Sequence, residues 1–471
     1  MADMPGEWHR FLYIKSMAKL KNIFLHDSEI AFDKKHRQTL NFNISKYDEA
    51  VAKGKLRYRN MDLAKQRASY LKGKVVSNLA TYLEEFERNA QKNGIEVLWA
   101  RNSKEAVSEI KKVLVANHAR LLVKGKSMIS EEIELNGHLE KAGYEPVETD
   151  LGEFIVQVAG EKPYHILTPA MHKSKEDVAA LFHEKFDTPE KSTPEELTAY
   201  VREVLRKKFT AAEIGITGSN FLVADVGGVA LTENEGNGFM SVAFPKVHIV
   251  ITGIEKIIPS INDLDLFFPL LSALGTGQQV TVYNSLLTGP KRDNEANGPG
   301  KMFVLLLDNK RSKIAEEKKH FEALKCLRCG ACLNACPIYK NVGGYTYNTT
   351  YSGPIGSVIT PLMKGFKQYD HLSFACTVCG ACTDVCPVKI PLHDLLLLNR
   401  KKSVEKKLDS YSWRKGMKAY EWAFKKRKNL DKVNGIAKNI MAKTNTNIVG
   451  KQKELPGFAK QSFSQQRKSN K

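Results

Sequence analysis

The sequence has no long apolar run. None of its 471 residues fall in a stretch that approaches the roughly 18 consecutive apolar residues of a membrane-spanning helix. The first 22 residues contain no apolar core followed by small residues, the pattern of a secretory signal. An apolar fraction of 42% and a charged fraction of 26% are ordinary for a globular chain. We therefore expect a cytoplasmic protein of roughly two to three domains.

Cysteine is absent from residues 1 to 325 and from residues 387 to 471. All eight cysteines lie in two segments, CLRCGACLNACP (326 to 337) and CTVCGACTDVCP (376 to 387). Each segment has the spacing C-x2-C-x2-C-x3-C-P, which is the bacterial iron–sulfur run. In a reducing compartment, cysteines at such short spacings are more often metal ligands than disulfides. Structural zinc and a disulfide framework are the alternatives, and neither calls for such a regular repeat.

The paired runs predict two [4Fe–4S] clusters with crossed ligand sets. Three closely spaced thiolates can bind three corners of a cubane cluster, and in two-cluster ferredoxins the fourth cysteine of each run binds the other cluster. One predicted set consists of Cys326, Cys329, Cys332 and Cys386. The other predicted set consists of Cys376, Cys379, Cys382 and Cys336. Gly330 and Gly380 permit tight turns beside the sulfurs. Two clusters indicate an electron relay.

Between about residues 90 and 310, β-rich runs alternate with helical patterns. This alternation is typical of βαβ units and predicts an α/β domain around a largely buried sheet. The predicted strands are residues 95 to 100, 120 to 125, 165 to 170, 221 to 233, 246 to 254, 278 to 285 and 301 to 309. The predicted helices include residues 56 to 93, 104 to 118, 130 to 143, 196 to 209 and 261 to 275. Thr193, Pro194 and Glu196 suit the N-cap, N1 and N3 positions of a helix.

The pattern changes after Asn309 and again near residue 400. We expect a helical extension over residues 1 to 55, the α/β domain over 56 to 310, the cysteine-bearing domain over 311 to 400 and a basic region over 401 to 471. Residues 311 to 325 read as a charged helix. The basic region holds 20 Lys or Arg against five Asp or Glu, so it carries most of the net charge of +20. Such a region attracts an anionic partner or membrane surface, unless it is only a solvated tail.

The basic region also contains an apolar stripe at helical spacing. The stripe consists of Trp413, Met417, Tyr420 and Phe424. It predicts an amphipathic basic helix, which we expect to pack on the chain's own core, with a membrane surface as the alternative. Nucleic acid is not expected as a partner, because basic residues are not interleaved with stacking aromatics in a recognised module.

Several polar residues of the α/β region are candidate ligand-binding groups. Lys124 and Lys126 could bind an anion at the N-terminus of the following helix, or they could be solvated lysines at a strand end. They do not form a P-loop, because its first glycine would fall on Arg120. An acidic turn holds a ligand, holds a partner's basic group or is a plain solvated loop; its residues are Glu148, Asp150 and Glu153. His165 and His172 are weaker candidates.

Six stretches, together with the two cysteine runs, resemble the lactate utilization iron–sulfur protein B family. They are KGKSMISEEIELN (124 to 136), VETDLGEFIVQVAGE (147 to 161), HILTPAMHK (165 to 173), GITGSNFLVADVGGVALTENEGNG (215 to 238), LLLDN (305 to 309) and YSGPIG (351 to 356). The resemblance covers nearly the whole chain. It implies an α/β lactate-utilization domain of the sugar-isomerase and CoA-transferase-like type, then an all-α helical ferredoxin domain and a basic helical C-terminal region.

The resemblance also implies a function and partners. The protein would be the iron–sulfur electron-transfer subunit of a cytosolic complex that oxidises L-lactate to pyruvate. The partners would be a cysteine-rich protein similar to a heterodisulfide reductase subunit and a second protein with the same α/β domain. No flavin- or nicotinamide-binding motif is visible, so the first oxidant and the final acceptor must come from elsewhere. Another 2-hydroxy acid such as glycolate is an alternative substrate.

Glu233 and Asn234 raise a different alternative. They resemble the Glu-Asn-Gly-type motif of CoA transferases of a similar fold, in which the glutamate forms a covalent acyl intermediate. Glu235 replaces the glycine of that motif. We therefore expect Glu233 and Asn234 to take part in binding without covalent chemistry. The competing function is an acyl or CoA transferase in which the clusters are regulatory.

Overall fold

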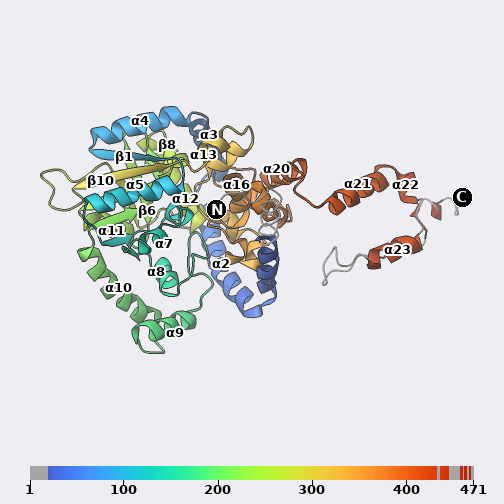
Figure 1. Ribbon diagram of the computed structural model, residues 1–471, viewed down its shortest axis with the longest axis horizontal. Helices are drawn as coiled ribbons and strands as arrows, with labels where there is room; N and C mark the ends of the chain where they lie inside the picture. The colour runs from blue at the N-terminus through green and yellow to red at the C-terminus, as the bar shows by residue number, and fades with distance from the viewer. Residues whose placement is uncertain (1–19, 432–434, 445–456, 460, 464–465, 468–471) are drawn as a thin grey trace, which may run out of the picture. The chain divides into compact units, whose positions relative to one another are not determined.

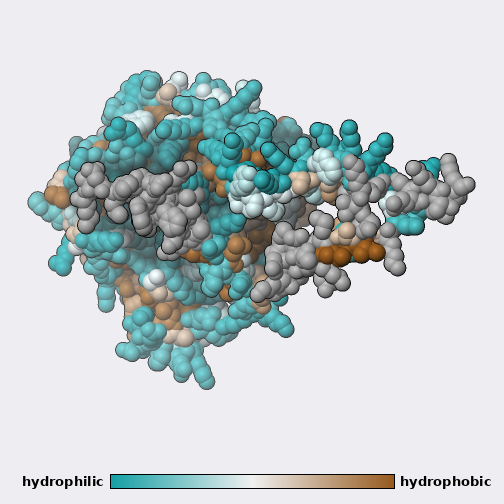
Figure 2. All heavy atoms as spheres, turned by 45° about the vertical axis from the view of Figure 1, so that its right-hand side comes forward, coloured by the Kyte–Doolittle hydropathy of each residue, from teal (hydrophilic) through white to brown (hydrophobic). Residues whose placement is uncertain are grey.

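The computed structural model describes residues 20–431, 435–444, 457–459, 461–463 and 466–467. The chain forms two compact units, Met1–Lys401 and Lys402–Lys471. Among the described residues, no helix is both long and apolar enough to cross a membrane. Hydrophilic side chains cover most of the face that Figure 2 shows.

A six-stranded parallel sheet is the centre of the first unit, with strand order β1-β10-β7-β4-β2-β3. The strands are β1 (Ile95–Ala100), β10 (Lys301–Leu307), β7 (Val247–Gly253), β4 (Ile214–Thr217), β2 (Leu121–Lys124) and β3 (Glu145–Glu148). Every residue of the central strand β7 is buried. A strand that is buried along its whole length is typical of a parallel sheet covered on both faces.

Helices cover both faces of this sheet (Figure 1). Ile249 and Leu305 pack in one core cluster with helices α5 (Ser103–Ala116) and α7 (Leu135–Glu140). The adjacent residues Val250 and Val304 pack in another cluster with helix α4 (Leu79–Lys92), because successive side chains of a strand point to opposite faces. The helices α8 (Leu151–Val158), α9 (Lys175–Phe186) and α10 (Pro194–Ala211) pack near strands β2 and β3.

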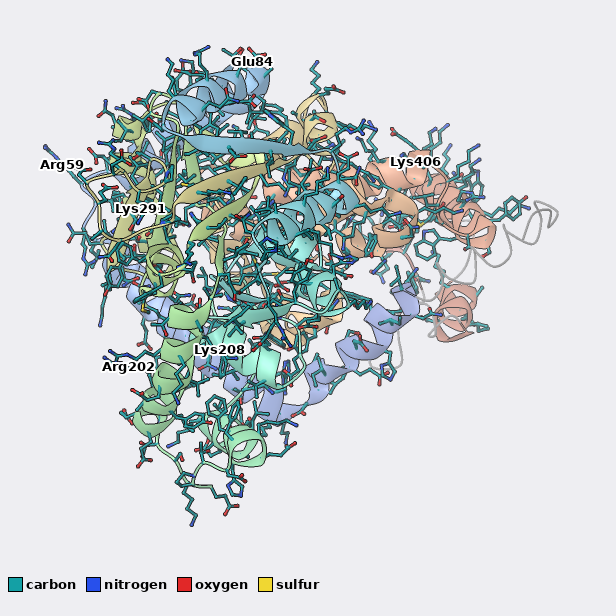
Figure 3. All side chains as sticks on the ribbon, turned by 60° about the vertical axis from the view of Figure 1, so that its left-hand side comes forward. Arg59, Glu84, Arg202, Lys208, Lys291 and Lys406 are labelled. Carbon is teal, nitrogen blue, oxygen red and sulfur yellow. The ribbon has the colours of Figure 1, made fainter. Side chains whose placement is uncertain are left out.

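The outer faces of these helices are charged. Glu84 on α4 and Arg202 on α10 point away from the sheet (Figure 3). Lys208 on α10 instead pairs with Glu145 at the start of strand β3. Thr193 and Glu196 form the predicted capping box of α10, with backbone N–H groups donating to both side chains. This start signal was therefore read correctly from the sequence.

A second sheet has the order β8-β5-β6-β9. Its strands are β8 (Ile257–Ile258), β5 (Phe221–Val223), β6 (Gly228–Glu233) and β9 (Tyr283–Leu287). The sequence pattern predicted a single sheet and a continuous strand over residues 221 to 233. The chain instead turns back at Gly227, which has a φ of 60°, so that β5 and β6 form an antiparallel pair. Only the end of the predicted strand 278 to 285 belongs to β9.

Three other sequence predictions in this region were wrong. Residues 165 to 170 form no strand; the His165 Nδ1 atom accepts the N–H groups of Leu167 and Thr168 and holds the segment as a loop. The helix predicted over residues 56 to 93 is two helices, α3 (Met61–Ser77) and α4, separated at Asn78. The helix predicted over residues 130 to 143 is likewise two, α6 (Met128–Glu132) and α7.

The cysteine-bearing segment is helical. It contains α13 (Arg311–Ala315), η4 (His320–Lys325), α14 (Ala331–Asn334), α15 (Tyr339–Val342), η5 (Tyr345–Tyr347), α16 (Gly353–Lys364), α17 (Phe366–Tyr369), α18 (His371–Phe374), α19 (Ala381–Asp384) and α20 (Leu392–Glu405). The charged helix predicted over residues 311 to 325 is split into α13 and η4. This segment shares one apolar core with helices α2 (Lys34–Lys55) and α12 (Leu264–Gly275).

Further short elements complete the described chain. They are η1 (Ser28–Phe32), α11 (Asn237–Ala243), η2 (Ile254–Lys256), η3 (Ile261–Asp263), α21 (Tyr411–Lys425), α22 (Arg427–Asp431) and α23 (Gly435–Thr444). The predicted apolar stripe lies on α21, where Tyr420 and Phe424 stack with ring centroids 4.3 Å apart. No residue of α21 is buried. We expected this stripe to pack on the chain's own core. Within the described residues of the second unit, α21 has no such core to pack on.

Candidate functional site

The two cysteine runs adopt the same backbone path. Arg328 and Val378 occupy equivalent positions and have φ values of 63° and 57°, in the left-handed region. Gly330 and Gly380, two residues later, have φ values of 74° and 84°. A short helix follows each glycine, α14 in the first run and α19 in the second. These paired turns curl the backbone around the cysteine side chains, which is why glycine is needed at both places.

Backbone N–H groups point at the sulfur atoms. Hydrogen bonds to ionised sulfur favour the thiolate, which is the form that binds metal. The contacts are Arg328 N to Cys326 Sγ at 3.4 Å, Val378 N to Cys376 Sγ at 3.2 Å and Ile390 N to Cys386 Sγ at 3.3 Å.

The eight thiols fall into two groups that cross between the runs. Burial, together with the charges of Cys326 and Cys386, raises the pKa of the Cys329 thiol to about 12. Burial likewise raises the pKa of the Cys382 thiol to about 12, together with the charges of Cys336, Cys376 and Cys379. The structure thus brings Cys386 to the first run and Cys336 to the second. One cavity is lined jointly by Cys326, Cys329, Cys332 and Cys386.

The donors in each of the two groups are cysteine thiols. All eight cysteines are free thiols, and Cys379 is the exposed one. Within the part of the chain that the structure describes, no three His, Cys, Asp or Glu side chains converge as a single metal ion would require. Four cysteines around one cavity are the donor set of a [4Fe–4S] cluster.

Four basic side chains surround the first group of thiols. Lys65 interacts electrostatically with the thiolate of Cys386. The side chains of Lys72, Lys256 and Arg328 interact electrostatically with the thiolate of Cys326. Lys65 donates to the carbonyl oxygen of Asp384 at 2.8 Å, and Lys72 donates to two carbonyl oxygens of the segment around η2. Burial lowers the pKa of Lys72 to about 7. Positive charge next to the thiols favours their ionised form and any anionic group that they hold.

A cavity of about 450 Å³ opens beside this group, and we call it the strand-end cavity. It lies at the carboxyl ends of the parallel strands β2, β4 and β7, where Lys126, Gly218 and Lys256 follow the respective strands. Leu327 and Arg328, from the first cysteine loop, complete its wall. Open α/β sheets bind their ligands at this edge. The cavity therefore lies between the carboxyl edge of the sheet and the loop that carries Cys326 and Cys329.

The candidate ligand-binding residues divide between several locations. Lys126 lines the strand-end cavity and donates to the carbonyl oxygen of Leu167 at 2.6 Å. Lys124 is 1% exposed and lies in a salt bridge with Glu148 at 2.7 Å, so it is an internal residue. Asp150 lines the strand-end cavity and caps helix α8 by accepting the N–H of Glu153.

Glu233 and Asn234 also line the strand-end cavity. The Glu233 carboxylate accepts the N–H groups of Gly238 at 2.6 Å and Phe239 at 2.7 Å, and so it caps helix α11. Asn234 exchanges side-chain hydrogen bonds with Gln278. Both residues are therefore held in place by contacts within the chain.

Glu153 lies in a second cavity, of about 950 Å³, which is lined by several carboxylates. Burial, reinforced by the charge of Glu148, raises the pKa of Glu153 from 4.5 to about 8. The histidines are packed groups: His165 hydrogen-bonds Asn334 at 3.1 Å, and His172 pairs with Glu161 at 2.7 Å.

Sequence reasoning missed two residues of the strand-end cavity, Lys256 and Arg328. Lys256 follows the buried strand β7, and a polar residue at the carboxyl end of a parallel strand is a recognisable signal. Arg328 stands between two cysteines of the first run, where the sequence alone does not show that it faces the α/β domain.

Comparison with known proteins agrees with this architecture. Residues 83–307 match the LUD domain, and residues 322–390 match the 4Fe-4S dicluster domain. Lactate utilization protein B of Bacillus velezensis is 42% identical over 365 residues, which cover 75% of this chain and 76% of that protein. Lactate utilization protein B of Bacillus subtilis is 41% identical over 386 residues, 80% of each chain.

Two further matches are more distant in name or in structure. The uncharacterized electron transport protein YkgF of Escherichia coli is 39% identical over 76% of this chain and 75% of its own. A crystal structure of a DUF162 family protein from Deinococcus radiodurans is 13% identical, covers 49% of this chain and 98% of that one, and has a TM-score of 0.29, which supports no structural argument. From the identities over three quarters of the chain and the two matched domains, the protein belongs to the lactate utilization protein B family.

Proposed function

We propose that the protein is the iron–sulfur electron-transfer subunit of a complex that oxidises L-lactate to pyruvate. The grouping of Cys386 with the first cysteine run and of Cys336 with the second is the observation that carries the proposal. This crossing is the ligand arrangement of two-cluster ferredoxins. The names of the curated relatives supply the link to lactate.

Each proposed [4Fe–4S] cluster has four cysteine ligands. The first set is Cys326, Cys329, Cys332 and Cys386. The second set is Cys376, Cys379, Cys382 and Cys336. Such clusters accept and pass single electrons when bound. The chain contributes backbone N–H groups aimed at the sulfurs and the four basic side chains around the first set, both of which tune the potential of the site.

The burial of the two sets suggests opposite roles. The first set adjoins the strand-end cavity, which is the side where a substrate would lie. The second set includes the exposed Cys379. A partner that takes or supplies electrons therefore docks over Cys379. We assign this place to the cysteine-rich, heterodisulfide-reductase-like protein, and we propose the second lactate-utilization-domain protein as a further member of the complex.

The basic C-terminal region adds a surface for an anionic partner or an anionic membrane surface. Its charge attracts such partners at low salt, and added salt screens the attraction. This role is independent of the cysteine ligands, which all lie before residue 387.

The alternative of an acyl or CoA transferase is disfavoured by the contacts of Glu233. Both of its carboxylate oxygens accept backbone N–H groups at the start of helix α11. A nucleophile needs an oxygen that is free to attack, so this carboxylate is already committed to a structural role. Glycolate remains an alternative substrate of the same chemical class as lactate.

Electron paramagnetic resonance (EPR) on the complex tests the proposal. The protein is purified without oxygen together with its two partners, and spectra are recorded before and after addition of L-lactate, D-lactate or glycolate. A reduced-cluster signal that appears with L-lactate and not with D-lactate supports the proposal. A signal with glycolate alone would change the substrate, and fully loaded clusters that respond to none of the three acids would contradict lactate oxidation.

A further inference from the structure

We propose that the strand-end cavity binds the carboxylate of a small 2-hydroxy acid through Arg328 and Lys256. The inference rests on the proposed function and places its substrate on this chain, next to the first cysteine set.

Arg328 carries unsatisfied hydrogen-bond donors. Its side chain is 8% exposed, and its Nε and Nη1 groups are buried without a hydrogen-bond partner among the described residues. The Nη2 group lies 3.4 Å from a carboxylate oxygen of Glu255, while the guanidinium lies over the Tyr351 ring at 4.3 Å. Buried donors of a charged group are costly to leave unpaired. A ligand with acceptor oxygens would satisfy them.

Lys256 places a second positive charge on the same wall. It is 7% exposed and lines the strand-end cavity with Arg328. Burial lowers the pKa of Lys256 to about 8, and the nearby charge of Arg328 lowers it as well, while the charge of Glu255 raises it. The neighbouring carboxylate, Glu255, is already bound by Arg311 at 2.5 Å. An anion between Lys256 and Arg328 would therefore relieve their mutual repulsion.

The carboxylates of the cavity, unlike Arg328, already have hydrogen-bond partners within the chain, so they do not favour a bound cation in the same way. Glu235 accepts the N–H of Leu151 at 3.2 Å, and Asp150 accepts the N–H of Glu153 at 3.1 Å. Glu233 uses both oxygens to cap α11. Among the described residues that line this cavity, the buried side-chain groups that lack partners are thus the donors of Arg328, and the matching ligand is an anion. Arg328 also lines the cavity of the first cysteine set, so it stands between the two cavities.

The distribution of charge also limits the kind of anion. Asp150, Glu233 and Glu235 line the cavity together with three cationic side chains, Lys126, Lys256 and Arg328, and these carboxylates repel a ligand that carries several negative charges, such as a nucleotide. A single carboxylate can bind the cationic wall while a neighbouring hydroxyl group donates to a carboxylate oxygen. A small 2-hydroxy acid has these two groups on adjacent carbons.

Binding of L-lactate to the anaerobic, cluster-loaded protein without its partners tests the inference. The affinity is measured by calorimetry for the wild type and for Lys256→Gln and Arg328→Gln, with neutral lactamide as the matched ligand. Loss of a charge-assisted contact should weaken lactate binding by roughly tenfold or more in each variant. Lactamide should bind at least tenfold more weakly than lactate even to the wild type, a comparison that requires no variant to fold.

Two further variants serve as controls. Glu235→Gln removes a negative charge from the cavity and should tighten lactate binding. Lys291→Gln removes a charge from an exposed loop residue (Figure 3) and should leave the affinity unchanged. Iron content and the EPR signal of each variant show whether its clusters are intact.

Several results would overturn the inference. They are unchanged lactate affinity in both cavity variants, equal binding of lactamide and lactate, or no binding to the wild type. An altered cluster signal in Arg328→Gln with unchanged affinity would mean that the guanidinium serves the cluster alone. If lactate reduces the clusters of the complex but does not bind this chain, the electron-transfer role stands and the cavity assignment falls. If lactate binds this chain but does not reduce the clusters of the complex, the cavity assignment stands and the electron-transfer role falls.

Discussion

The Nη2 atom of Arg311 lies 2.7 Å from the Oε2 atom of Glu132, and both side chains are buried. The same guanidinium binds Glu255 through Nε at 2.5 Å. Tyr351, from the segment between the cysteine runs, donates to Glu132 at 2.5 Å. The ion pair thus fastens the start of the cysteine-bearing segment to α6 and to the end of strand β7. It fixes the position of the cysteine loops relative to the sheet.

Replacing Arg311 by Met should destabilise the protein by about 3 to 5 kcal/mol, because it leaves the buried carboxylate of Glu132 without its counter-charge and leaves Glu255 with only the longer contact to Arg328. Urea unfolding of the cluster-loaded protein measures the loss. Arg101→Met is the matched control, because Arg101 pairs with Glu105 on the surface and its side chain is 87% exposed. The control should unfold at the wild-type urea concentration. Equal midpoints for the two variants would contradict the structural role of Arg311.

Glu153 should make the protein less stable as the pH rises. Its carboxyl pKa is raised by burial from 4.5 to about 8. Between these values the folded state holds a proton that the unfolded chain releases, so the free energy of unfolding falls as the pH rises through this window. Glu153→Gln replaces the titrating carboxyl group by a neutral amide, so the unfolding free energy of the variant should lack this pH dependence. In the wild type the loss of stability is about 1.4 kcal/mol for each unit by which the pKa is raised.

The readout is urea unfolding of wild type and Glu153→Gln at pH 5, 7 and 9. Above pH 8 the variant should be the more stable protein. Parallel stability curves for the two proteins would show that Glu153 is ionised at neutral pH. Glu255 should behave in the opposite way. Burial raises its carboxyl pKa, but the charge of Arg311 lowers it, and the resulting pKa is about 2. The stabilisation from ionised Glu255 should therefore be lost only as the pH falls from 4.5 towards 2.

The two glycines of the cysteine runs should tolerate alanine unequally. Both have positive φ, so alanine costs about 1 to 2 kcal/mol of backbone strain at each. A Cβ atom at Gly330 would also meet the Leu167 side chain at 3.1 Å, whereas at Gly380 it would meet nothing within 4 Å. Gly330→Ala should therefore lose its cluster absorbance at a lower urea concentration than Gly380→Ala. The reverse order would rule out the Leu167 contact as a constraint.

The sequence predicted local features better than their assembly. The C-x2-C-x2-C-x3-C-P spacing identified the iron–sulfur segment, and the capping residues Thr193 and Glu196 located the start of α10. Mainly apolar, buried strands such as β7 were found for the same local reason. The hairpin at Gly227 was missed because a pair of glycines inside a β-rich run does not show where the chain reverses.

The candidate site depended on contacts between distant residues, which a pattern within one segment does not contain. Lys124 and Lys126 look alike in the sequence, but one is neutralised by Glu148 and the other lines the strand-end cavity. Arg328 faces the end of β7 only because Arg311 and Glu132 fasten the two parts of the chain together. Tertiary contacts of this kind separate a ligand-binding residue from a structural one.

The crossing of the cysteine sets predicts which variants should resemble each other. Cys386→Ala should lose the same EPR signal as Cys329→Ala, although the two cysteines belong to different runs. Cys336→Ala should instead match Cys379→Ala. The spectra of the four variants, reduced with dithionite, decide between the arrangements. A match of Cys386→Ala with Cys379→Ala would mean that each run holds its own cluster.

The most direct measurement is the iron and sulfide content of the anaerobically purified chain, combined with its EPR spectrum after reduction. Two four-iron clusters predict about eight irons and eight sulfides per chain and a spectrum of two interacting centres. About four irons would leave one of the ligand sets without a cluster. Zinc in place of iron would contradict the electron-transfer role altogether.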